Sequence, residues 1–341
     1  MAAGTKLHCP LTEGIFSMDR ITETTIGAAR VGILGDPHLG RTFIRGVPLD
    51  KRCLREGMVS RDFRQRLENS GRYDVHICTG DLFDRWAVPY VVVFEAAWAY
   101  LAAARSNPET RYFVLAGNHD ISRDLKRKGA LDLFELIVSR CQNVFVVRHG
   151  RGALLAEMGG VKVGFFPFHP ITPAAELVTE EIDVAFGHWD TICGHDNMVP
   201  TERFAEVGCR TVYTGHVHLP DEFTRDGVKV VQVGSMQPYA HGEDTGEMYV
   251  TLRPEELEGT DLRDKCVRVL LNRGEPFDQQ VDCLQLSFKR VGDNEDDAVE
   301  EVSMGEFDLM ALFSQAFEEA GVPQTVREKL VERFEEARIK E

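Results

Sequence analysis

The sequence predicts a layered α/β fold, and three observations support this. Between about residues 29 and 242, short runs rich in β-branched and aromatic residues alternate with loops and helical segments. A chain of 341 residues is long enough for one large core with smaller appendages. Polar groups led by a glycine follow several of the predicted strands, and ligands in α/β sheets bind beyond the carboxyl ends of strands.

Strands and helices of the main domain, residues 29–245, follow from the apolar patterns. Strands are predicted at residues 30–34, 75–79, 112–116, 161–166, 184–186, 211–213 and 228–233, and helices at 61–70, 91–104 and 131–139. The helix at 91–104 reads VVVFEAAWAYLAAA and carries Glu95 as its only charge. A helix that is apolar on every face is buried on every face. It is therefore either an internal core helix or a homodimer interface.

The rest of the chain reads as four further segments. Residues 1–28 form an N-terminal extension, and residues 246–292 form a second, smaller unit with strands at 248–252, 265–271 and 281–291. Residues 293–304 form an acidic linker. Residues 305–341 form a helical tail that is split at Gly321 and Pro323.

The tail carries two apolar stripes. Its first half places Phe307, Met310, Phe313 and Phe317 on one face, and its second half begins at Pro323 and places Val326, Leu330 and Phe334 four apart. Two short amphipathic helices cannot bury both stripes alone in water. Either the protein's own core or a partner covers them, and the self-repelling acidic linker favours a partner.

Charge is distributed unevenly along the chain. The formal net charge is −16, but residues 293–341 hold fifteen acidic and five basic residues, while residues 41–66 hold eight basic and three acidic ones. A second basic run follows at residues 123–128. Such runs are either solvated helix faces or phosphate contacts, and their position beside the polar motifs favours phosphate contacts. The candidate DNA-binding residues are Arg41, Arg45, Lys51, Arg52, Arg123, Lys126, Arg127 and Lys128.

Cysteine usage and hydropathy predict a cytoplasmic protein, in the host cytoplasm if the source is viral. The eight cysteines are scattered and none forms a CxxC pair, which fits a reducing compartment. The first 29 residues lack the apolar core of a signal peptide, and no membrane association is predicted.

Five glycine-led motifs carry the chemistry. They are Gly35-Asp36-Pro37-His38, Gly80-Asp81-Leu82-Phe83-Asp84, Gly117-Asn118-His119-Asp120, Gly187-His188-Trp189-Asp190 and Gly215-His216-Val217-His218. Their carboxylate, amide and imidazole ligands suit Mn²⁺, Fe²⁺ or Zn²⁺, and no thiolate is offered. Asp81 is the candidate bridge of two cations, and His195 is the alternative to His188. Such a pair acidifies a water and stabilises an in-line phosphoryl transfer.

These motifs, in this order, resemble the calcineurin-like metallophosphoesterases. The resemblance implies a layered α/β/β/α sandwich. It also implies one metal held by Asp36, His38, Asp81 and His218, and a second held by Asp81, Asn118, His188 and His216. It places His119 beside the scissile phosphate, as a charge stabiliser or general acid.

Further motifs narrow the resemblance. GDPHLG, GDLFD and GNHD are similar to the nuclease subunits of SbcCD-type repair complexes, and FIRGVPLD and GHWD are most similar to their phage recombination-endonuclease branch. This implies a manganese-dependent DNA exonuclease and endonuclease. It also implies a homodimer near helix 91–104, a small α+β capping domain, and an SbcC-like coiled-coil ATPase bound through residues 305–341. Asp84 departs from the pattern, because cellular members usually carry histidine there.

Two other functions compete with this one. A phosphoesterase for nucleotides or phosphoproteins would use the same metal cluster. A binding protein on an inactive phosphoesterase fold would have lost ligands, and none of the seven is missing.

Overall fold

The structure is a computed structural model that describes Arg20 and residues 22–191, 197–243 and 248–291. The acidic linker, the helical tail and His195 lie outside the described residues. The chain divides into two compact units, one of residues 1–270 and 277–289 and one of residues 271–276 and 290–341. The larger unit contains all five polar motifs.

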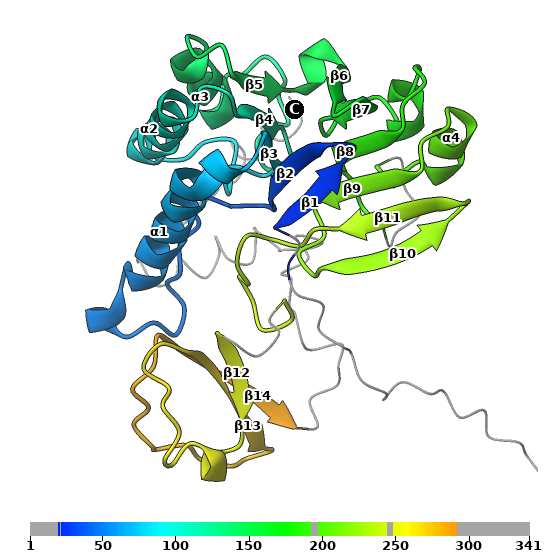
Figure 1. The fold of residues 1–341 in the computed structure, drawn as a ribbon. Coiled ribbons are helices and arrows are strands. Elements are labelled where there is room, and N and C mark those ends of the chain that lie inside the picture. The colour runs from blue at the N-terminus through cyan, green and yellow to red at the C-terminus, as the bar shows by residue number, and fades with distance from the viewer. Residues whose placement is uncertain (1–19, 21, 192–196, 244–247, 292–341) are drawn as a thin grey trace, which may run out of the picture. The chain divides into compact units, whose positions relative to one another are not determined.

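Two β-sheets form the centre of the larger unit (Figure 1). The first has the order β1-β2-β3-β4-β5 and consists of β1 (Glu23–Ile26), β2 (Ala29–Leu34), β3 (Val75–Cys78), β4 (Arg111–Leu115) and β5 (Val144–Val147). The second has the order β10-β11-β9-β8-β7-β6 and consists of β6 (Leu154–Met158), β7 (Val161–Phe166), β8 (Val184–His188), β9 (Thr211–Gly215), β10 (Asp221–Arg225) and β11 (Val228–Gln232). Strands β2 to β5 are parallel, as are β7, β8, β9 and β11, whereas β1, β6 and β10 are antiparallel edge strands.

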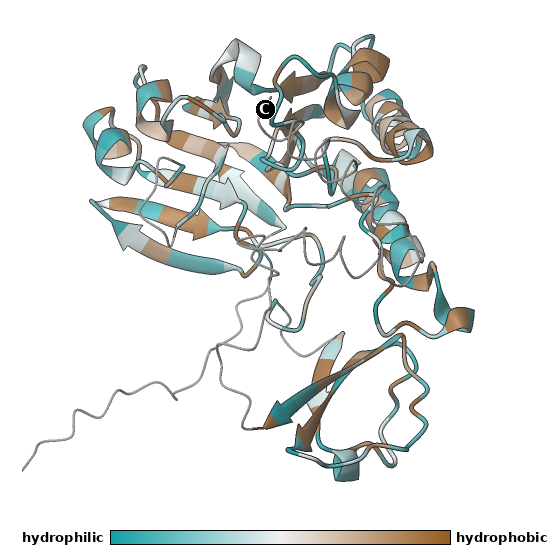
Figure 2. Cartoon of the chain, turned by 180° about the vertical axis from the view of Figure 1, so that it is seen from behind, coloured by the Kyte–Doolittle hydropathy of each residue, from teal (hydrophilic) through white to brown (hydrophobic). Residues whose placement is uncertain are grey.

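Three hydrophobic clusters stack these sheets into layers. Helices α1 (Leu54–Glu68), α2 (Tyr90–Ser106) and α3 (Ala130–Val138) pack on the first sheet, where Tyr100 contacts Phe63, Phe134 and Tyr112. A second cluster joins the two sheets, with Phe113 stacked on Phe165 at 4.2 Å between ring centroids. On the far face of the second sheet, Trp189 packs against Phe204 of α4 (Thr201–Glu206). The resulting order is α/β/β/α, with hydrophobic residues concentrated in the inner strands and their covering helices (Figure 2).

Several elements differ from the sequence prediction. Helix α1 begins at Leu54 rather than residue 61, because Gly57 and Ser60 weaken the helical pattern of its first turns. Strand β1 pairs antiparallel with β2, so residues 23–26 extend the first sheet. Strand β10 has the sequence DEFTR, whose polar residues suit a solvated edge and conceal the strand signal. Strands β5 and β6 and helix α4 are likewise absent from the prediction.

A third sheet contains β12 (Tyr249–Leu252), β13 (Cys266–Asn272) and β14 (Gln285–Val291) in that order. It matches the three strands predicted in residues 246–292. The described residues also contain five short 3-10 helices: η1 (Leu49–Lys51), η2 (Asn69–Arg72), η3 (His149–Arg151), η4 (Ala174–Leu177) and η5 (Pro254–Glu256). Within the described ranges, no helix has both the length and the apolarity needed to span a bilayer.

Candidate metal centre

The polar motifs meet where the parallel strands of both sheets end. Asp36 and His38 follow β2, Asp81 follows β3, His188 ends β8, and His216 follows β9. His38, Asp81 and His216 have φ angles of 45°, 47° and 78°, in the left-handed region that non-glycine residues seldom adopt. Such strain costs of order 1–3 kcal/mol per residue and is typical of functional sites.

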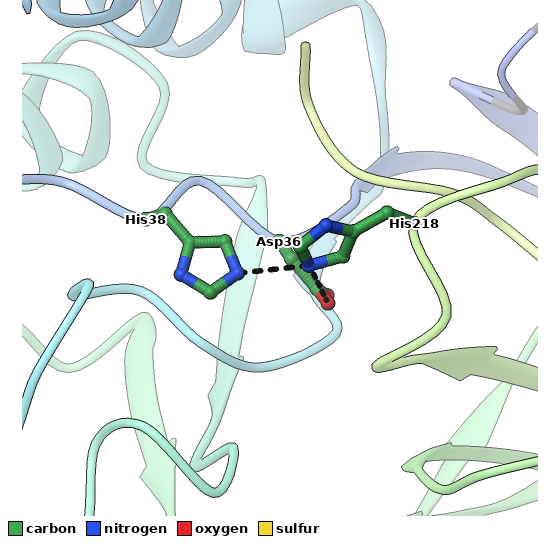
Figure 3. Close-up of side chains that lie close together, drawn as sticks. All are labelled: Asp36, His38 and His218. Atoms are coloured by element: carbon green, nitrogen blue, oxygen red, sulfur yellow. Dashed lines mark hydrogen bonds and ion pairs between the residues drawn. The ribbon is translucent and has the colours of Figure 1, made fainter. Parts of the chain in front are cut away.

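The first cluster consists of Asp36, His38 and His218, which point toward one another (Figure 3). The Nε2 atoms of His38 and His218 lie 3.0 Å apart. The Nε2 atom of His218 lies 3.8 Å from Asp36 Oδ2, and that of His38 lies 3.7 Å from Asp81 Oδ2. Asp36 and His38 come from the first sheet and His218 from the second, so this cluster joins the two sheets.

The second cluster consists of Asp81, His188 and His216, with Asn118 among them. Asn118 Oδ1 lies 3.0 Å from His188 Nε2 and 3.0 Å from His216 Nδ1. Asp81 Oδ2 lies 3.4 Å from His188 Nε2. Asp81 thus faces histidines of both clusters, which is the position that a bridging carboxylate requires.

The donor atoms of both clusters have the spacing of ligands around a shared cation. Two ligands bonded at about 2.1 Å and separated by about 90–130° lie roughly 3.0–3.8 Å apart, which spans the distances in both clusters. Asp36 Oδ1 is buried and has no hydrogen-bond partner among the described residues, although His188 Nδ1 lies 4.0 Å away, so it has coordination capacity to spare. Burial lowers the pKa of His188, but Asp81 and Asp36 outweigh it and raise that pKa to about 9. The site therefore stabilises positive charge at its centre, and its residues fit a pair of divalent cations.

Two motif glycines are required by the close approach of the loops. A Cβ atom on Gly117 would lie 2.1 Å from Asp81 Oδ1, and one on Gly80 would lie 2.2 Å from His188 Nδ1. Neither contact is physically possible, so these glycines let the loops bring the ligands together.

His119 does not belong to the predicted ligands, but a nitrogen of its ring lies within 4.8 Å of ligand atoms of His38 and Asp81. Its exposed ring donates from Nδ1 to the backbone carbonyl of Asp84 at 2.7 Å, which leaves Nε2 available. Its backbone N–H donates to Asp81 Oδ1 at 2.9 Å. The Asp84 carboxylate is largely buried, and it lies 3.6 Å from His38 Nδ1 and 3.5 Å from Arg41. Asp84 therefore orients His119 through its backbone and faces His38 through its side chain.

Asp120 is a supporting residue to which the sequence assigns no role. Its buried carboxylate accepts hydrogen bonds from the backbone N–H groups of Phe83 and Gly117, both at 2.9 Å, and of Leu82 at 3.2 Å. These bonds hold the GDLFD and GNHD loops together. The aspartate that closes the GNHD motif is the only sequence signal for this role.

The loop of residues 235–243 also supports the site, and the sequence analysis missed it. The Tyr239 hydroxyl group lies within hydrogen-bonding distance of the carbonyls of Asp36 and Pro37. Glu243 Oε1 lies 2.9 Å from His218 Nδ1. No local motif marks these residues, because their partners are 25 to 203 positions away.

The candidate DNA-binding residues fall into two groups. Arg123, Lys126, Arg127 and Lys128 are exposed, although Arg127 pairs with Asp124 at 3.4 Å and Lys128 with Asp132 at 3.3 Å. In the other group, Arg45 and Arg52 are exposed, Lys51 pairs with Asp282 at 2.9 Å, and Arg41 lies over the Tyr239 ring. Elsewhere in the 41–66 run, Arg55 is buried and bonds to Gln237 and to the Pro238 carbonyl. That run is therefore partly structural.

A cavity of about 540 Å³ opens beside Asn118 and His119. Its lining includes three arginines and one indole, namely Arg85, Arg123, Arg127 and Trp86, together with the carboxylates of Asp84 and Asp124. The guanidinium of Arg127 lies 6.0 Å from the centre of the Trp86 ring. We call this cavity the arginine groove. It connects the catalytic candidate His119 to the second basic run.

Two sandwiched sheets with paired histidine and aspartate clusters at their strand ends define a metal-dependent phosphoesterase. The family model described as calcineurin-like phosphoesterase matches residues 29–220. That range covers more than half of the chain and includes every predicted metal ligand, so the protein belongs to the calcineurin-like phosphoesterase family.

The other comparisons add no closer relationship. No curated protein matches the chain. Among solved structures, phosphopantetheinyl hydrolase from Mycobacterium tuberculosis is 12% identical, covers 63% of this chain and 95% of its own, and has a TM-score of 0.37. An archaeal phosphodiesterase is 17% identical, covers 62% and 87%, and has a TM-score of 0.33. Vps29 from Entamoeba histolytica is 15% identical, covers 62% and 77%, and has a TM-score of 0.30.

Proposed function

We propose that this phosphoesterase is a manganese-dependent DNA nuclease that acts in DNA end processing, recombination and repair. The observation that carries the proposal is the arginine groove, which leads away from Asn118 and His119. Guanidinium groups pair with phosphates, and an indole ring can stack on a base whatever its identity. A substrate longer than one nucleotide would contact both the arginines and the indole ring.

The residues of the site suit hydrolysis of a phosphodiester. Bound divalent cations would supply Lewis-acid stabilisation of the phosphoryl charge and acidify a water. His119 donates from Nδ1 to the Asp84 carbonyl, so Nε2 is the nitrogen left to face the substrate, and the imidazolium form of the ring would give the Nε2 proton to the leaving oxygen. Asp120 fixes the loop that presents His119. The mixed nitrogen and oxygen ligands favour Mn²⁺, since Mg²⁺ prefers oxygen and retains its waters.

A phosphoesterase for nucleotides or phosphoproteins is the alternative. The metal clusters do not choose among phosphoesters, because the chemistry at phosphorus is the same. The arginines in the lining favour the nuclease, since a single nucleotide would not need Arg123 and Arg127 in addition to the cation clusters.

We also propose a homodimer through α2 and α3. One face of α2 packs in the core through Val93, Ala97 and Tyr100, so the helix is partly the core helix that its sequence allows. The opposite face exposes Tyr90, Phe94 and Trp98 to 82%, 56% and 58% at a spacing of four residues. Leu136 of the contacting helix α3 is 70% exposed. Apolar faces of this kind mark protein interfaces. Light scattering of Trp98→Glu should show a monomer where the parent chain is a dimer.

The partner is proposed from the tail sequence and the family resemblance. An SbcC-like coiled-coil ATPase would receive the two amphipathic stripes of residues 305–341 as helices docked in a groove. A chain truncated after Glu301 should retain manganese-dependent hydrolysis and lose co-purification with the ATPase. Undiminished binding by the truncated chain would remove the tail from the proposal.

The groove provides the test of substrate class. Arg123→Ser combined with Arg127→Ser should lower hydrolysis of linear duplex DNA and leave hydrolysis of a nitrophenyl nucleotide diester unchanged. Arg203→Ser is the matched control, because this arginine lies on α4 and pairs with Glu206. Equal loss on both substrates, or no loss on DNA, would contradict a DNA-binding groove.

A further inference from the structure

The loop of residues 235–243 carries the carboxylate of Glu243, which contacts the predicted metal ligand His218. Glu243 Oε1 lies 2.9 Å from His218 Nδ1, and Oε2 accepts a hydrogen bond from the Tyr239 backbone N–H at 2.8 Å. The Glu243 side chain is 20% exposed, so its charge is largely removed from water. Both oxygens are therefore committed, one to the loop and one to the histidine.

This contact determines which nitrogen of His218 faces the cation cluster. A carboxylate accepts hydrogen bonds and cannot donate them while it is ionised, so His218 Nδ1 must carry the proton. The lone pair is then on Nε2, the atom that lies 3.0 Å from His38 Nε2 and 3.8 Å from Asp36 Oδ2. Carboxylates in this position fix ring orientation and raise the basicity of a ligating histidine.

In the other cluster, a backbone carbonyl rather than a side chain orients His188, whereas His216 Nε2 lies 3.9 Å from Asp190 Oδ2. His188 Nδ1 lies 3.0 Å from the backbone carbonyl of Thr79, which leaves its Nε2 facing Asn118 and Asp81. A substitution cannot remove that carbonyl. His188 and His218 therefore differ in the group that orients them. A change at Glu243 acts on His218 and not on His188.

The loop itself is anchored independently of this contact. Met236 N–H donates to the Asp36 carbonyl at 3.1 Å, and Ser235 N–H donates to the His218 carbonyl at 3.0 Å. Arg20 donates to the carbonyls of Ser235 and Glu243 at 2.9 and 2.8 Å. None of these bonds uses the Glu243 carboxylate, so the loop can keep its place when the carboxylate is replaced.

We propose that Glu243 is a positioning residue that selectively sets the affinity of the cation held by Asp36, His38 and His218. The inference rests on the metal centre of the proposed function and not on DNA as its substrate. Removing the carboxylate frees His218 to take either tautomer and to rotate. Loss of such a supporting partner typically lowers metal affinity about 10- to 100-fold. The cation held by Asn118, His188 and His216 should keep its affinity.

Manganese binding to the full chain tests the inference without any substrate. Free Mn²⁺ is titrated into wild type, Glu243→Gln and the control Glu222→Gln, a glutamate on edge strand β10, and electron paramagnetic resonance monitors free and spin-coupled manganese. Wild type and the control should bind two ions. Glu243→Gln should bind one with unchanged affinity and the other about 10- to 100-fold more weakly, with loss of the coupled signal.

A double variant and the melting temperature of the metal-free protein exclude a purely structural role. In a His218→Ala background, Glu243→Gln should cause no further loss, because its effect passes through His218. The metal-free Glu243→Gln protein should melt as wild type does. Two ions bound with wild-type affinity would overturn the proposal, and so would joint weakening of both ions with a lowered melting temperature. A chain that fails to cut DNA would contradict the nuclease function and leave these binding results standing.

Discussion

Replacing His119 with alanine should remove most hydrolysis while leaving the cation clusters in place. The ring of His119 is exposed, and within the described part of the chain it makes one hydrogen bond, from Nδ1 to the Asp84 carbonyl. Losing that bond costs about 1 kcal/mol of stability. The backbone N–H that donates to Asp81 Oδ1 remains in the variant. The fold and the bridging carboxylate should therefore survive.

The kinetic effect should be larger than the effect on stability. A general acid contributes roughly 10²- to 10⁴-fold to the rate, which equals about 2.7–5.4 kcal/mol at 1.36 kcal/mol per decade. The assay compares kcat for a phosphodiester with an alcohol leaving group, such as a dinucleotide, with manganese stoichiometry and melting temperature, because a nitrophenolate leaves without needing a proton. His169→Ala is the control, because this histidine lies on a loop outside the clusters. An unchanged rate, or loss of manganese from the variant, would refute the assignment of His119.

Three further predictions concern the metals and pH. Manganese should support faster hydrolysis than magnesium, measured at equal free concentrations, and equal turnover in magnesium would contradict the ligand reasoning. Asp81→Asn should lose manganese and activity together, because Asp81 faces histidines of both clusters. Burial lowers the pKa of His76 to about 4 from its usual 6.5, so the native state binds fewer protons than the unfolded state between these values. Stability should accordingly fall as pH drops, by about 2 kcal/mol from pH 7 to pH 5, and urea unfolding of His76→Gln should lack this component.

The buried strands and the motifs that follow them were predictable from the sequence. Parallel strands covered on both faces, such as β2 and β3, read as continuous apolar runs with a glycine and an aspartate directly after them. Strands β1 and β10 were not predictable in this way, because edge strands carry polar residues on their solvated sides.

The supporting residues of the site could not be predicted from the sequence, for a different reason. Glu243 and Tyr239 act through contacts with His218 and Asp36 that only the tertiary fold creates. The basic run of residues 41–66 shows the same limit. Composition does not distinguish the buried Arg55 from the exposed Arg45, since both are arginines in one amphipathic stretch.

Relative hydrolysis of DNA and a small diester tests the central claim most directly. The purified chain is assayed with Mn²⁺ on linear duplex DNA and on a nitrophenyl nucleotide diester, with Asp81→Asn as the blank. We predict a higher kcat/KM for DNA than for the diester. This difference should shrink as salt concentration rises, because phosphate contacts release counterions. Hydrolysis of the diester with no cleavage of DNA would contradict the nuclease function and favour a phosphoesterase for nucleotides or phosphoproteins.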